Sequence, residues 1–150
     1  MGVYLNPGNV DFQEVLNSKI YVDKSELIQY TNSVLRTTQK YICVSRPRRF
    51  GKSMAANMLT AYYSRGCDSR EMFQGLKIAK HTDFEKHLNQ YNVIHLNMRD
   101  YLTESENMKQ LIQFVEEDLL DELQQEFADL RMPRRKTLVK VLEQAFAQYK

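Results

Sequence analysis

Apolar positions recur at helical spacing over most of the chain. The clearest stripe runs from Glu106 to Leu130, and a shorter one follows Gly51 and stops before Gly66. Further helices are expected over residues 11–16, 23–32, 68–75, 83–88 and 134–149. Either Asp23 or Ser25 would cap the second of these. The pattern therefore predicts a series of helices joined by short connections.

Two apolar runs do not follow this spacing. Tyr41–Val44 is continuous, and Tyr91–Asn97 carries Val93, Ile94 and Leu96. Such runs are typical of buried strands in a parallel sheet. Strands that alternate with helices predict an α/β fold around a single core. Because two strands make a poor sheet, we expect this fold to be incomplete in the 150 residues.

Composition indicates an ordinary globular protein, with 43% hydrophobic and 27% charged residues. A net charge of +2 does not indicate a nucleic-acid partner, and the basic run Arg134–Lys136 leaves that question open. The N-terminus does not resemble a signal peptide, and no run reaches the roughly 18 apolar residues of a membrane span. We therefore expect a cytoplasmic protein with no membrane partner and with Cys43 and Cys67 reduced.

The connection after Tyr41–Val44 has the pattern of a phosphate-binding P-loop, or Walker A loop. That pattern is glycine, four residues and Gly-Lys-Ser or Gly-Lys-Thr, placed between a strand and a helix. Here it consists of Arg46, Pro47, Arg48, Arg49, Phe50, Gly51, Lys52 and Ser53. Gly51 permits close approach of the backbone to a phosphate, Lys52 supplies charge to the β- and γ-phosphates, and the Ser53 hydroxyl would hold Mg²⁺. The loop predicts ATP and Mg as cofactors.

The first glycine of the pattern is replaced by Arg46. If that position needed a positive φ, an arginine there would cost about 1–2 kcal/mol. Alternatively, the backbone would follow a different path at the start of the loop, with Pro47 fixing its own φ. Arg48 and Arg49 would either add positive potential beside the phosphates or pack on the surface and pair with acids elsewhere.

The run from Arg46 to Ser53, together with Tyr21–Ile28 upstream, resembles the AAA-ATPase-like domain family. Met54–Leu59 and Cys67–Leu76 are also similar to that family. The resemblance implies a P-loop NTPase-type three-layer parallel sheet with flanking helices, of which residues 1–150 would be the N-terminal part. It also implies that Tyr21–Ile28 lies near the nucleotide; from the residues alone, a capped helix start packing on the sheet is an equal alternative.

The function predicted is ATP binding, with no catalytic residue assigned within the chain. The second strand ends at Asn97 where an ATPase needs a metal-linked acid, so hydrolysis is expected only in a longer parent protein. The alternative is a nucleotide-dependent switch or interaction module without hydrolysis. In the family a PD-(D/E)XK nuclease-type domain often follows, and this module would then regulate it. The apolar stripes of the two last helices predict contact with a further domain or with a second copy.

Overall fold

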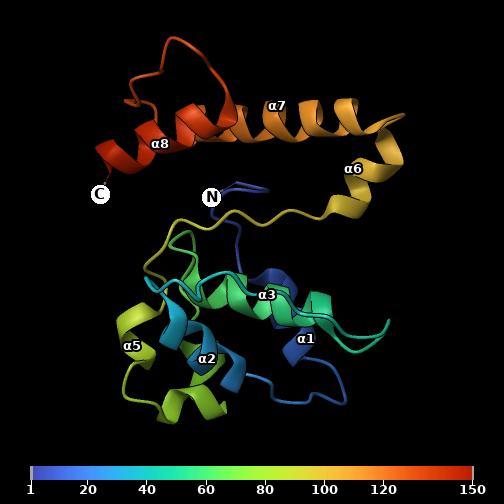
Figure 1. The fold of residues 1–150 in the computed structure, drawn as a ribbon. Coiled ribbons are helices and arrows are strands. Elements are labelled where there is room, and N and C mark those ends of the chain that lie inside the picture. The colour runs from blue at the N-terminus through green and yellow to red at the C-terminus, as the bar shows by residue number, and fades with distance from the viewer. Residues whose placement is uncertain (1, 150) are drawn as a thin grey trace. The chain divides into compact units, whose positions relative to one another are not determined.

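Helices make up the regular structure of the chain. The computed structural model describes residues 2–149 (Figure 1). Within these residues the elements are α1 (Val10–Leu16), α2 (Glu26–Val34), α3 (Lys52–Tyr63), α4 (Arg70–Gln74), the 3₁₀ turn η1 (Lys77–Lys80), α5 (Phe84–His87), α6 (Met98–Glu104), α7 (Met108–Glu126) and α8 (Leu138–Gln148). The helices predicted from apolar spacing are confirmed to within a few residues at each end, whereas α6 and η1 were not predicted.

The helix ends follow the polar residues that flank them. Ser25, rather than Asp23, is the N-cap of α2. Asn107 caps α7, and its side chain accepts a hydrogen bond from the Gln110 N–H. Ser69 and Gly75 bound the short helix α4.

The predicted three-layer parallel sheet is wrong for this structure. Among residues 2–149 there is no strand, and pairing is limited to two isolated bridges, Leu5–Ile94 and Ser64–Tyr91. The run Tyr41–Val44, expected to be a buried strand, is exposed, with Tyr41 85% accessible. A strand is stable only when neighbouring strands satisfy its backbone groups, and no such neighbour lies beside this run in the described part of the chain. The apolar pattern of Tyr41–Val44 is compatible with a strand, but it does not specify the neighbouring strands that a strand needs.

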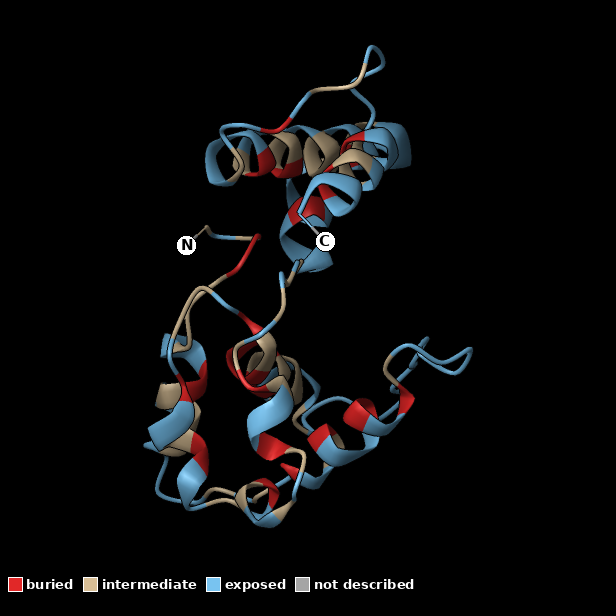
Figure 2. Cartoon of the chain, turned by 90° about the vertical axis from the view of Figure 1, so that its left-hand side faces the viewer, coloured by how far each residue is buried: buried red, intermediate tan, exposed pale blue. Residues whose placement is uncertain are grey.

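Two compact units replace the single expected core. One unit comprises residues 6–93, and the other comprises residues 2–5 together with the chain from Ile94 onward. In the first unit α1 packs against α3, and buried positions line the inner faces of the helices (Figure 2). Its buried cluster is Phe12, Ile28, Met58, Ala61, Tyr62, Phe73, Ile78, Phe84 and Leu88. This cluster fixes α3, whose first turn carries Lys52 and Ser53, the last two candidate loop residues.

In the second unit α7 and α8 pack on each other. Leu123, Val141 and Ala145 are buried between them, so the predicted apolar stripes partly cover one another. The carboxylate of Glu122 on α7 accepts the backbone N–H groups of residues 3–5, at N···O distances down to 2.6 Å. The N-terminal segment is thereby fixed to α7. Across residues 2–149, no helix combines the length and the apolar character that crossing a membrane requires.

Candidate functional site

The predicted loop turns sharply just before α3. Arg46–Phe50 is an exposed connection, and Lys52 begins the helix. Two residues have left-handed backbone conformations: Arg49, with φ 69°, and Gly51, the N-cap of α3, with φ 75° and ψ 30°. Phe50 between them has no positive φ. Alternation of this kind turns successive backbone N–H groups toward a common concavity, which is a geometry that binds anions.

Arg46 occupies the first position of the pattern without backbone strain. Its φ lies outside the left-handed region, so the cost considered for an arginine there does not arise. Within the loop, the non-glycine residue with a positive φ is Arg49. The loop therefore places its unusual dihedral angles at its C-terminal end, next to α3.

The side chain of Lys52 folds back over the loop. Its ammonium group donates hydrogen bonds to the carbonyl oxygens of Arg46 and of Pro47, the latter at 3.3 Å. Ser53 follows in the first turn of α3, where its hydroxyl is exposed and makes no hydrogen bond within the described residues. No acidic residue lies in this turn, so the positive end of the helix dipole is not neutralised there.

A second segment, Tyr21–Ser25, lies beside the loop and is fixed by Asp23. One carboxylate oxygen of Asp23 accepts the Ser25 N–H and the other accepts the Lys77 N–H, each at 2.8 Å. Burial alone would raise the pKa of the Asp23 carboxyl, but hydrogen bonds from Ser25 and Lys77 outweigh burial and lower the pKa. The Ser25 hydroxyl accepts the N–H of Ile78 at 3.1 Å. The segment is thus tied to η1 at two points, through Asp23 and Ser25.

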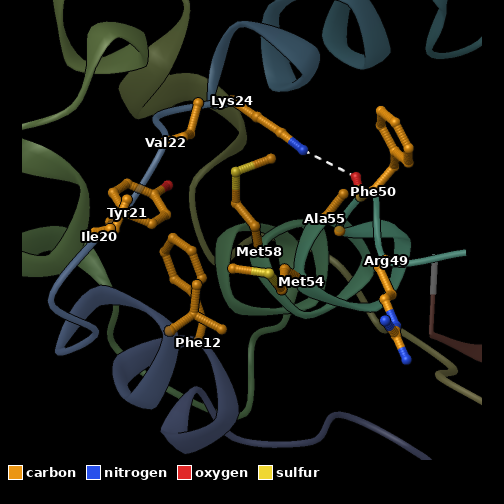
Figure 3. Close-up of a pocket in the computed structure, with 12 residues that line it drawn as sticks. Phe12, Ile20, Tyr21, Val22, Lys24, Arg49, Phe50, Met54, Ala55 and Met58 are labelled. Carbon is orange, nitrogen blue, oxygen red and sulfur yellow. Dashed lines mark hydrogen bonds between the residues drawn. The ribbon is translucent and has the colours of Figure 1, made fainter.

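Lys24 extends from this segment to the loop. Its ammonium group donates a hydrogen bond of 3.0 Å to the carbonyl oxygen of Phe50 (Figure 3). Beside this contact lies a pocket of about 260 Å³ between α1, the Tyr21 segment and α3. Its lining is mostly apolar and consists of Phe12, Val15, Ile20, Tyr21, Val22, Lys24, Arg49, Phe50, Gly51, Met54, Ala55 and Met58. The pocket is continuous with the C-terminal half of the loop, since both share Arg49, Phe50 and Gly51.

Comparison with protein families places almost the whole chain in a family. A family model described as predicted AAA-ATPase matches residues 7–150, which is almost the whole chain. The chain belongs to this AAA-ATPase-like family. Searches of curated proteins and of solved structures find no match. Membership confirms the resemblance seen in the sequence and is consistent with a nucleotide ligand in general terms.

In this AAA-ATPase-like chain the eight predicted residues run from the exposed connection Arg46–Phe50 through Gly51 into the first turn of α3, where Lys52 and Ser53 lie. Lys52 contacts the first two of them, whereas the guanidinium groups of Arg48 and Arg49 pair with no acid within residues 2–149. Sequence reasoning did not single out Lys24 or the apolar pocket. Lys24 lies within the Tyr21–Ile28 run that carried the family resemblance, but its contact with the loop spans 26 positions and no local pattern predicts it.

Proposed function

We propose that this chain binds ATP, as its Mg²⁺ complex, through the loop Arg46–Ser53. The observation that carries the proposal is the position of the Lys52 ammonium group, which lies over the loop on two neutral carbonyl oxygens. A phosphate oxygen is a stronger acceptor because it is charged, so a phosphate chain would take this ammonium group from the carbonyls. Family membership supports a nucleotide as the ligand.

The remaining parts of the site have complementary roles. Backbone N–H groups from Arg48 to Ser53, together with the unneutralised start of α3, would hold phosphate oxygens. The exposed Ser53 hydroxyl offers the kind of oxygen that Mg²⁺ prefers. The apolar pocket bounded by Phe12 and Met58 would receive the base.

The proposal concerns binding rather than turnover. Neither the loop nor the lining of the pocket contains an Asp or Glu that would activate a water molecule. The hydrogen bonds of Lys52 to the loop carbonyls favour a second function, a nucleotide-dependent switch without hydrolysis. Binding of a nucleotide would move Lys52 off the loop backbone. Both functions predict binding without turnover in this chain, and only the switch requires the loop to change conformation when the nucleotide binds.

The test is titration of the chain with a fluorescent ATP analogue in the presence of Mg²⁺. Lys52→Met keeps the apolar stem of the side chain and removes its charge. Hydrogen bonds to charged groups contribute about 1.5–3 kcal/mol, so we expect binding to weaken by about tenfold to a hundredfold. Lys109→Met is the matched control, because Lys109 is an exposed lysine on α7 with no contact to the loop. Equal affinity of the Lys52 and Lys109 variants would refute the proposal.

A further inference from the structure

Lys24 is placed to reach the same ligand as Lys52. Its ammonium nitrogen lies 3.0 Å from the Phe50 carbonyl oxygen and 3.0 Å from the point where a Cβ on Gly51 would stand. Lys52 binds carbonyls at the opposite end of the loop, on Arg46 and Pro47. Two ammonium groups from distant parts of the sequence therefore bracket a single loop.

Hydrogen bonds fix the backbone on either side of Lys24. Asp23 and Ser25, on either side of it, are tied to Lys77 and Ile78 in η1. The Lys24 side chain is exposed, and its hydrogen bond within the described residues goes to the neutral carbonyl of Phe50. An ammonium group has three donors, so at least two of them remain available to a ligand.

The one carboxylate beside Lys24 in the sequence does not compete for it. Both oxygens of Asp23 accept backbone N–H groups, from Ser25 and from Lys77, and Asp23 forms no ion pair with Lys24. The Lys24 ammonium group is therefore not held in an ion pair with Asp23. A negatively charged acceptor entering the loop would bind this ammonium group more strongly than the Phe50 carbonyl does.

Lys24 also lines the apolar pocket, at the point where the pocket joins the loop. We propose that Lys24 is a second phosphate-binding lysine. It binds the part of a nucleotide's polyphosphate chain that lies between the base in the pocket and the Lys52 end of the loop. This inference rests on the proposed function. It assigns the site to nucleoside polyphosphates rather than to inorganic phosphate, since only a ligand with both parts spans the pocket and the loop.

The experiment measures Kd for Mg-ATP and for Mg-tripolyphosphate with the parent chain and three variants. Lys24→Met and Lys52→Met each remove one ammonium group, and Lys109→Met is the control. We expect Lys24→Met to weaken the binding of both ligands by about tenfold, as removal of one charged hydrogen bond does. We expect the parent to bind inorganic phosphate much more weakly than Mg-ATP.

Salt dependence distinguishes a ligand contact from a role in shaping the loop. Loss of a cation that touches phosphate reduces the slope of log Kd against log salt concentration, because exposed charges are screened by salt. We expect this reduction for both Lys24→Met and Lys52→Met. An unchanged slope, or unchanged tripolyphosphate binding, for Lys24→Met would overturn the role of Lys24 and leave the Lys52 loop assignment intact. If neither variant changes binding, the proposed function itself fails.

Discussion

Gly51 is the position where the loop depends most directly on the backbone conformation of one residue. Its φ of 75° lies in the left-handed region, and a side chain added there meets the Lys24 ammonium nitrogen at 3.0 Å and the Met54 sulfur at 3.6 Å. Both of these atoms are ends of flexible side chains and can move. The cost of Gly51→Ala therefore arises mainly from backbone strain, with displacement of Lys24 from Phe50 as its local consequence.

The expected change in the free energy of unfolding for Gly51→Ala is the sum of two opposing effects. A left-handed conformation costs a residue with a Cβ about 1–2 kcal/mol. Replacing glycine by alanine also restricts the unfolded chain, which stabilises a protein by about 0.4–1 kcal/mol where the native conformation is compatible. For Gly51→Ala the strain exceeds this gain, and we expect a net loss of about 1 kcal/mol in the free energy of unfolding.

Gly75→Ala provides a matched control in the same unit. Gly75 has φ −86° and ψ −3°, and a Cβ built there meets nothing within 4 Å. It should be neutral or stabilising, because only the effect on the unfolded chain operates. Urea unfolding followed by tyrosine fluorescence measures both variants, since the chain has no tryptophan. A midpoint for Gly51→Ala at or above that of Gly75→Ala would refute the strain argument.

Two further predictions concern carboxylates that accept backbone N–H groups. The lowered pKa of Asp23 means that its stabilising contribution is fully present above the unfolded value of about 3.8 and is lost as pH falls through the lower folded value. Asp23→Asn should therefore reduce the free energy of unfolding more at pH 6 than at pH 3; an equal reduction at both would contradict the assignment. In the second unit, Glu122→Gln should speed hydrogen exchange of the backbone amides of residues 3–5 by at least about tenfold. The exposed neighbour Asp121→Asn should leave that exchange unchanged, and equal exchange rates in both variants would contradict the role of Glu122.

Helices were predictable because their signal is local. The apolar stripe after Gly51 and the one between Glu106 and Leu130 repeat every three to four residues, and each folds as α3 or α7. The strand predicted at Tyr41–Val44 was wrong because strand formation depends on partners elsewhere in the chain. An apolar run specifies a segment that can be extended, and pairing decides whether it becomes a strand.

The same distinction between local signals and contacts with distant parts of the chain applies to the candidate site. Arg46–Ser53 was recognisable from its order and from the helix that follows, and its role in binding stays a prediction. The position of Lys24 follows instead from the hydrogen bonds of Asp23 and Ser25 to η1, more than 50 positions away. Such contacts exist only once the unit has folded.

The hydrogen bonds of the two lysines bear on how relatives of this chain are compared. Lys24 and Lys52 each bond a loop carbonyl, so selection for the shape of the loop alone would retain both. The Ser53 hydroxyl bonds to nothing within the described residues, and the loop gains no shape from it. Within the family, retention of this hydroxyl should therefore distinguish members that bind a nucleotide from members that keep only the turn.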